Sequence, residues 1–477
     1  MANISSPTLE KPLNQKKPDP SSYNLIYLII FGCFLVSGIS ALIYEVVWTR
    51  MLTYVFGGTT LAVSTVLTAF LGGLAIGSYF GGKYIDHFKK PLLAYGILEL
   101  TIGIYGLLVP IIFSDNFLGP IWQTVVQMFE SVQFISYIVR FFISVILLAL
   151  PTILMGATLP VLSRYLTNVR SDIVPFNVGA LYTINTTGAI IGTFFSGFVF
   201  LPVFGVNTTV YIAAFLNLAL ALAVIFLARA NQKVQADTPD SALSAGKAAD
   251  LEVVIAESGE EIPKKLIKLT MLGFVVSGFV ALVYEVTWTR TLTLVFGSST
   301  YAFSTMLVTF LIGLALGTAL MTKLQEKIER PVFWIGAILC GIAASGFLTA
   351  CFFNELPWMF LSKAQKLPDD PATSWFLLTM HRFFISSGVM FLPTFLSGMI
   401  FPLVIRVYSA NPDHVGESVG KLYSLNTLGA ILGSFTSGFI FIPLFGILGS
   451  GIQTTTKLAI LIALGMEIGR ASCRERV

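Results

Sequence analysis

Long apolar runs separated by short polar joints dominate this chain. A helix needs about 20 apolar residues to cross the hydrocarbon core of a bilayer, so each run predicts a membrane-spanning helix. Six are expected before residue 230 and six after residue 265. The expected spans are 25–49, 58–82, 91–113, 136–166, 176–204, 206–229, 269–290, 299–322, 331–353, 375–408, 418–446 and 447–466.

The second set of spans repeats the first. Residues 37–57, SGISALIYEVVWTRMLTYVFG, return 240 positions later as SGFVALVYEVTWTRTLTLVFG. The segment GALYTINTTGAIIGTFFSGFVFLPVFG, which starts at Gly179, is answered by GKLYSLNTLGAILGSFTSGFIFIPLFG from Gly420. Chance does not align glycines, prolines and charges together, so the chain contains an internal duplication. Because each copy has an even number of spans, both copies start on the same side of the membrane and the two repeats are parallel.

The duplication divides the chain into five parts. These are a disordered polar tail (1–24), a first six-helix repeat (25–229), a polar linker (230–265), a second six-helix repeat (266–466) and a final stretch (467–477). The linker is rich in Asp, Glu, Ser, Ala and Lys and has too little apolar content to form a core. The final stretch reads EIGRASCRERV, which looks like a translated sequencing adapter, so we expect the native chain to continue past about Met466.

Composition excludes most other classes of protein. The chain is 55% hydrophobic and only 11% charged, whereas soluble domains are about a quarter charged. It is therefore expected to be an all-α integral membrane protein, and a transmembrane barrel is excluded because its strands would alternate over about ten residues.

No catalytic or phosphate-binding motif is present, so no catalytic residue and no cofactor are expected. The scattered cysteines and isolated histidines predict neither a disulfide framework nor a metal site. They are Cys33, Cys340, Cys351, Cys473, His87, His381 and His414.

The distribution of Lys and Arg predicts the orientation. Most of them lie in the joints on one side, together with the amino-terminal tail and the linker. By the positive-inside rule that side is cytoplasmic, which places both ends and the linker inside the cell and the protein in the inner membrane. The lipid bilayer is then its immediate partner, and the basic joints give no support to nucleic-acid binding.

Charged residues inside the repeated motif are the first candidates for function. Glu45 lies ~30 Å into the first span from its cytoplasmic start. It is therefore expected near the outer face, level with Arg50 and with Arg140, which begins the fourth span. One interpretation is an ion-paired gate or a site for a cationic or zwitterionic ligand; the other is a structural salt-bridge lock at the helix ends. The copies of these residues are Glu285, Arg290 and Arg382.

Glu99 has no counterpart, because the equivalent position in the second repeat is Leu339. It lies ~12 Å into its span. An intramembrane carboxylate is a functional hypothesis by default, so Glu99 is a candidate proton-coupling group or counter-charge for an amine. The alternative is a glutamate that only hydrogen-bonds to neighbouring helices.

Asn185 and Asn426 lie in the fifth span of each repeat among glycines spaced as GxxxG. This spacing lets helix backbones approach closely, so we interpret the region mainly as a packing surface, with the asparagines as interhelical hydrogen-bond donors. Between the second and third spans, GSYFGGKYIDHFKK (77–90) resembles a loop of major-facilitator transporters that acts as a conformational latch. The second copy, GTALMTKLQEKIER, is less similar to that loop.

Taken together, YEVxWTR, NTxGAxxG and their second copies resemble the membrane region of fused major-facilitator/spermidine-synthase-like proteins. The resemblance implies a major-facilitator-like fold of about 12 helices. It also implies a cytosolic polyamine-synthase domain, which transfers an aminopropyl group from decarboxylated S-adenosylmethionine; this chain has no motif that could bind that donor. Whether the full-length protein is an enzyme therefore stays open.

Three functions follow from this resemblance. The first is a transporter-like module for polyamines or other small amines, working by alternating access. The second is the membrane anchor or regulatory region of a polyamine synthase (aminopropyltransferase) whose catalytic, C-terminal soluble domain is missing here. The third is a structural or partner-binding membrane protein.

The parallel arrangement predicts the result of topology mapping. Reporter tags in the linker (230–265) and at the amino terminus should both be protected from reagents outside the cell. A linker tag that is labelled from outside while the amino-terminal tag is not would refute the parallel repeat.

Overall fold

A computed structural model describes residues 20–56, 59–114, 116–129, 133–169, 174–236, 264–297, 300–353, 355–365, 368–408 and 414–444. The expected twelfth span (447–466), the final stretch (467–477) and most of the tail and of the linker lie outside these residues.

The described chain is helical throughout. The first half consists of α1 (Pro20–Phe56), α2 (Thr59–Ile85), α3 (Pro91–Ile112), α4 (Leu118–Met128), α5 (Gln133–Val169), α6 (Val174–Phe195), the π-helical η1 (Ser196–Phe200) and α7 (Leu201–Ala236). The second half consists of α9 (Lys264–Phe296), α10 (Thr300–Leu324), the short 3₁₀ segment η2 (Gln325–Lys327), α11 (Pro331–Cys351), α12 (Leu356–Ala364), α13 (Pro371–Tyr408), α14 (Val415–Thr436) and the π-helical η4 (Ser437–Phe441).

Ten candidate membrane spans occur within the described residues. One of them, Phe176–Ala230, contains the two antiparallel helices α6 and α7. The chain reverses within the first turns of α7, at Gly205, whose φ of 76° lies in the left-handed region that favours glycine. Every expected span before residue 447 therefore corresponds to an observed helix.

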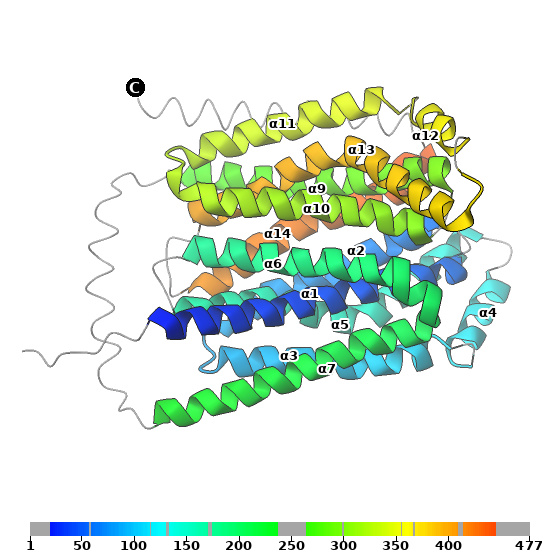
Figure 1. Ribbon diagram of the computed structural model, residues 1–477. Helices are drawn as coiled ribbons and strands as arrows, with labels where there is room; N and C mark the ends of the chain where they lie inside the picture. Colours follow the sequence, from blue (N-terminus) through cyan, green and yellow to red (C-terminus); the bar gives the residue numbers. More distant parts are fainter. Residues whose placement is uncertain are drawn as a thin grey trace, which may run out of the picture.

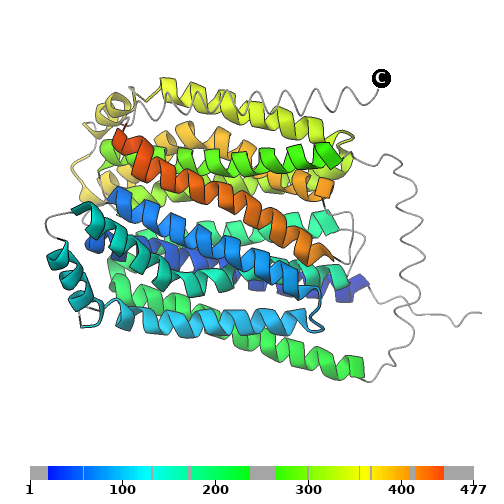
Figure 2. The same ribbon diagram turned by 180° about the vertical axis from the view of Figure 1, so that it is seen from behind.

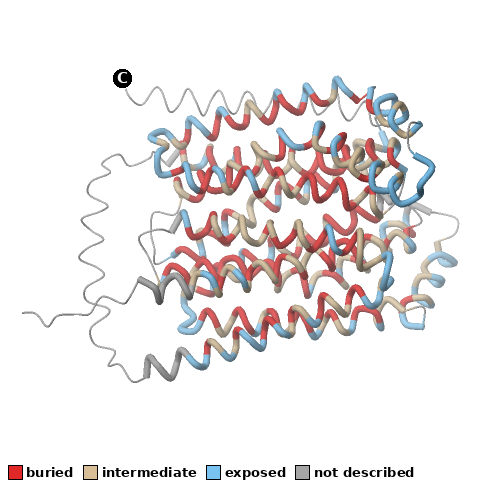
Figure 3. Tube along the Cα trace, viewed as in Figure 1, coloured by how far each residue is buried: buried red, intermediate tan, exposed pale blue. Residues whose placement is uncertain are grey.

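The described helices form one bundle made of two units, α1 to α7 and α9 to η4 (Figures 1 and 2). Both units begin at the same end of the bundle, where α1 and α9 start, which confirms the parallel arrangement. The short helices α4 and α12 lie at the opposite end and were not expected from the sequence. Burial is concentrated where helices face one another, and exposed positions lie on the outer faces and at the ends (Figure 3).

The two halves meet mainly through α2 against α14 and α6 against α10. At the end where α1 and α9 start, Gly82 of α2 faces the backbone of Gly416 and Gly420. At the opposite end, Gly438 of η4 faces the hydroxyl of Ser64 on α2. The halves are therefore in close contact at both ends of their interface.

Prolines inside α5 and α13 do not end these helices. Each proline removes one backbone N–H and so frees the carbonyl four residues earlier. The carbonyl of Leu147, freed by Pro151, accepts a hydrogen bond from the hydroxyl of Tyr105 at 2.6 Å. The carbonyl of Gly398, freed by Pro402, accepts one from Thr318 at 2.9 Å. Hydroxyl groups of neighbouring helices thus satisfy these two carbonyls.

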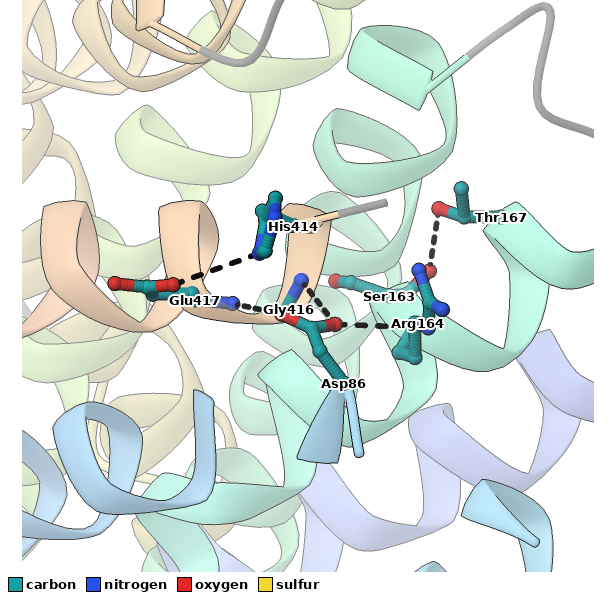
Figure 4. A network of polar contacts seen from close by, with 7 residues as sticks. All are labelled: Asp86, Ser163, Arg164, Thr167, His414, Gly416 and Glu417. Atoms are coloured by element: carbon teal, nitrogen blue, oxygen red, sulfur yellow. Dashed lines mark hydrogen bonds and ion pairs between the residues drawn. The ribbon is translucent and has the colours of Figure 1, made fainter. Parts of the chain in front are cut away.

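A polar network that we call the latch joins the two halves where α2 ends (Figure 4). The carboxylate of Asp86 accepts hydrogen bonds from the backbone N–H groups of Gly416 (3.1 Å) and Glu417 (2.8 Å), at the start of α14. Arg164 of α5 approaches the same carboxylate at 3.5 Å. Asp86 therefore satisfies free N–H groups of a helix of the other half, where a negative charge is favoured. The latch lies in the segment that resembles the major-facilitator loop.

Replacing Gly77 with alanine is expected to destabilise the first half. A Cβ at Gly77 of α2 would overlap the backbone carbonyl of Ile153 on α5, and overpacking of this kind costs about 1–3 kcal/mol. Gly72→Ala in the same helix is the matched control, since a Cβ there has no neighbour within 4 Å. Thermal unfolding of both variants in one detergent should show a lower midpoint for Gly77→Ala alone; equal midpoints would contradict the close contact.

Replacing Asp86 with alanine is expected to shift the two halves apart at the latch. The substitution removes the cap of α14, which is the contact between the halves; it is worth about 1 kcal/mol and changes a two-state population by about fivefold. Spin labels at Lys89→Cys and Lys421→Cys, in a cysteine-free background, report the separation of α2 and α14.

The matched control is Glu417→Gln, which removes an exposed ion pair with His414 but leaves the backbone N–H in place. Longer distances are expected for Asp86→Ala and not for Glu417→Gln. An unchanged distance distribution in Asp86→Ala would show that the latch does not hold the halves together.

Candidate functional site

A cavity of about 250 Å³ lies between the two halves. Its walls come from the middle turns of α1, α2, α5 and α6 and of their counterparts α9, α10, α13 and α14. Such a position, at the interface of structural repeats, is where transporters of this architecture hold substrate and coupling ions.

The lining of the cavity follows the internal duplication. Glu45, Asn185 and Tyr182 of the first half are matched by Glu285, Asn426 and Tyr423 of the second. Phenylalanines, leucines, serines and threonines of the two halves are paired in the same way, and no Lys, Arg or His is among the lining residues. The further pairs include Phe34 with Phe274, Ser37 with Ser277, Phe70 with Phe310, Leu74 with Leu314 and Thr186 with Thr427.

Glu45 and Glu285 are the charged residues of the cavity wall. They are 6% and 8% exposed, and they lie close enough for their charges to interact. No cationic side chain of the described chain forms an ion pair with either of them. Since unpaired carboxylates are costly in a low-dielectric interior, this arrangement favours a proton or a cationic ligand.

The expected ion-paired clusters of Glu45 and Glu285 with arginine do not form within the described residues. Helix α1 continues to Phe56, so Glu45 is about 16 Å from its end and not at the outer face. Arg50 lies about 140° around the helix from Glu45 and contacts the ring of Tyr54 at 5.2 Å. Arg290 occupies the equivalent turn of α9 and is half-buried.

Arg140 and Arg382 bind helix ends and not the glutamates. The Arg140 guanidinium donates to the carbonyl of Val55 at 2.6 Å, and Arg382 donates to the carbonyl of Phe296 at 3.3 Å. Both carbonyls belong to the last turn of the first helix of each half, where a cation is favourable. These two arginines are therefore equivalent caps at one end of the bundle, remote from the cavity.

The two asparagines lie at helix–helix contacts and also line the cavity. The amide of Asn426 donates to the carbonyl of Phe274 on α9 at 3.4 Å, and Asn185 and Asn426 both face the cavity. Gly38 and Gly278 lie against their backbones so closely that a Cβ would overlap the asparagine carbonyl oxygen. The GxxxG surfaces thus bring α1 against α6 and α9 against α14, which places the glutamates and asparagines around one space.

Glu99 of α3 is completely buried, and it lies just behind the cavity wall. Its carboxylate accepts hydrogen bonds from the hydroxyl of Ser37 on α1 (2.6 Å) and from the amide of Asn217 on α7 (2.7 Å). Ser37 itself lines the cavity, so it connects Glu99 to that space. The equivalent Leu339 is also fully buried, which shows that the second half fills this position with an apolar side chain.

Sequence reasoning did not single out Tyr182, Tyr423, Ser37 or Ser277, although all four lie in the duplicated segments. Tyr182 and Tyr423 approach each other across the interface, with ring centroids 6.4 Å apart. Duplication of the tyrosines was a usable signal, but their meeting depends on how the two halves pack.

Comparison with known proteins agrees with this architecture. The family model of the Major Facilitator Superfamily matches residues 29–434. Among solved structures, the major facilitator superfamily proton:xylose symporter XylE bound to 6-bromo-6-deoxy-D-glucose is similar, with a TM-score of 0.53 and 15% identity over 94% of this chain and 95% of that chain. The nucleoside transporter NupG is similar with a TM-score of 0.51 and 14% identity over 94% of this chain and 98% of that chain.

A curated relative is Polyamine aminopropyltransferase 1 of Streptomyces coelicolor (strain ATCC BAA-471 / A3(2) / M145). It is 22% identical over 204 residues, which are 43% of this chain and 34% of that protein. The match therefore spans about a third of the relative's length.

The family match covers most of the chain, and the solved structures share its fold. The chain is a multi-pass membrane protein with a transporter-like fold, and it belongs to the Major Facilitator Superfamily.

Proposed function

We propose that this protein transports small amines that carry two or more positive charges, with the short polyamines as the best-fitting class. The observation that carries the proposal is the pair of carboxylates, Glu45 and Glu285, that line one cavity without basic side chains and form no ion pair within the described residues.

Electrostatics selects the sign of the charge on the substrate. Two carboxylates in a low-dielectric cavity repel an anion, and each gains several kcal/mol when a cation enters and pairs with it. The walls contributed by Tyr182, Tyr423 and Phe401 add aromatic faces, which attract ammonium groups. An organic cation is therefore favoured over a sugar or an organic acid.

Symmetry favours a substrate with two charged ends. Glu45 and Glu285 are equivalent residues of the two halves, so a linear diamine can place one ammonium group against each. A cavity of about 250 Å³ accommodates a small molecule of this kind. The name of the curated relative, a polyamine aminopropyltransferase, supports the same chemical class.

Movement of the two halves provides the transport step. Alternating access in parallel-repeat transporters is a rocking of one half against the other around a central site. Close contacts at both ends of the interface and the Asp86 latch are the parts that such a motion must break and remake.

A second function is favoured by the same relative: this chain is the membrane region of a polyamine synthase and anchors or regulates its catalytic domain. In that case Glu45 and Glu285 sense or retain an amine without moving it across the bilayer.

Uptake by proteoliposomes tests the proposal. Wild-type protein should accumulate radiolabelled 1,4-diaminobutane above empty liposomes. Glu45→Gln and Glu285→Gln should each reduce uptake by about 10- to 100-fold, because losing one charged hydrogen-bond partner costs about 1.5–3 kcal/mol.

Glu417→Gln is the matched control, since this carboxylate is exposed and lies outside the cavity. Uptake by both cavity variants at the wild-type rate would contradict the assigned site. Wild-type liposomes that accumulate no more diamine than empty ones would favour the synthase-anchor function.

A further inference from the structure

The first half contains a buried carboxylate that the cavity symmetry does not explain. Glu99 is completely buried, while its equivalent Leu339 keeps the second half apolar at this position. Ser37 donates to Glu99, whereas the equivalent Ser277 donates at 2.7 Å to the carbonyl of Phe274 within its own helix. A purely structural group would be expected in both copies of a duplicated scaffold, as the Arg140 and Arg382 caps are.

Within the part of the chain that the structure describes, no cationic side chain pairs with Glu99. The ionisable side chains that face it are Cys33 and Tyr44 from α1 and Tyr95 from α3, all of which are neutral when protonated. Helix α7 contributes the amide of Asn217. The charged side chains of the neighbouring helices are engaged or exposed elsewhere: Glu45 in the cavity, Arg50 on Tyr54, Arg140 on Val55, Arg164 on Asp86 and Arg229 at the surface.

The surroundings of Glu99 can satisfy both of its protonation states. When it is ionised, Ser37 and Asn217 each donate a hydrogen bond to it. When it is protonated, its O–H needs an acceptor, and the side-chain oxygen of Asn217 is buried without a partner. Rotation of the side-chain amide exchanges the positions of its NH₂ group and its oxygen. The oxygen then accepts a hydrogen bond from the O–H of the protonated acid.

Ser37 contacts both Glu99 and the cavity. With Glu99 ionised, the hydroxyl hydrogen of Ser37 points to the carboxylate, and its oxygen lone pairs remain for the cavity side. With Glu99 protonated, that hydrogen is free to turn to the cavity, where it opposes a cation. An ammonium group in the cavity also favours the ionised carboxylate behind the wall through its charge.

We propose that Glu99 binds an exchangeable proton whose release is coupled, through Ser37, to entry of a cationic amine into the cavity. This inference rests on the proposed function and adds the coupling ion and its direction. On amine binding, the O–H bond of the Glu99 acid breaks and the proton passes to bulk water. On amine release, the carboxylate takes a proton back. Amine and proton therefore exclude each other, and transport is an exchange of the two.

Calorimetry of 1,4-diaminobutane binding to the purified protein, repeated in two buffers of different ionisation enthalpy, counts the protons released per bound diamine. Coupling is reciprocal, so Glu99→Gln should still bind the diamine while releasing about one proton fewer than wild type at the pH of maximal release. Comparing the variant with wild type removes the contribution of protons exchanged by Glu45 and Glu285.

Ser37→Ala and Ser277→Ala form a matched pair, because both serines line the cavity but only Ser37 contacts Glu99. Proton release should fall in Ser37→Ala and persist in Ser277→Ala. Equal proton release from Glu99→Gln and wild type would overturn the proposal, as would equal effects of the two serine variants.

Infrared spectroscopy keeps the proton site testable without any amine. The C=O band of a protonated carboxylic acid should change with pH in the wild type, and one component of that change should be absent from Glu99→Gln. A wild type that binds no diamine at any pH contradicts the proposed function and the coupling. In that case this band still shows whether Glu99 binds an exchangeable proton. An identical pH-dependent band in both proteins would show that Glu99 is not the proton site.

Discussion

Two carboxylates that share one cavity inside a membrane-spanning bundle impose the main constraint on this molecule. Glu45 and Glu285 are nearly buried, close to each other and without a cationic partner in the described chain. A low-dielectric interior penalises such a pair unless protons or a cation compensate the charge. Because the two glutamates line a cavity, the cost of burying them becomes a preference for binding a cation there.

Close backbone contacts make that position possible. Glycines on α6 and α14 let α1 and α9 approach them, and glycines on α2 and α10 let α5 and α13 do the same. These contacts fix helices within each half, so rigid halves can move against each other. The Asp86 latch lies at one end of the interface, where a rocking of the halves changes its contacts.

Much of the fold was predictable because a bilayer leaves few options. Apolar length identified the spans, and duplication identified the parallel halves. The predicted ion pair between Glu45 and Arg50 does not form, because residues five positions apart on a helix point in different directions. Helix α1 also extends beyond the motif, which places Glu45 deeper in the bundle. Helices α4 and α12 were missed because they are too short to be recognised as spans, and η1 and η4 because a shift of helix hydrogen bonding has no clear sequence pattern. Glu99 was identified from its burial in an apolar run, but its partners Ser37 and Asn217 come from distant segments that only the tertiary structure brings together.

We assign two tasks to these features: the symmetric cavity, built by both halves, recognises a positive charge, and Glu99 of the first half exchanges a proton. Recognition is the more basic of the two, since coupling has no meaning without a bound cation. A structure determined with 1,4-diaminobutane tests it most directly. The account predicts the diamine in the central cavity with one nitrogen beside Glu45 and the other beside Glu285. A cavity without diamine at a saturating concentration, or a ligand held away from both carboxylates, would contradict it.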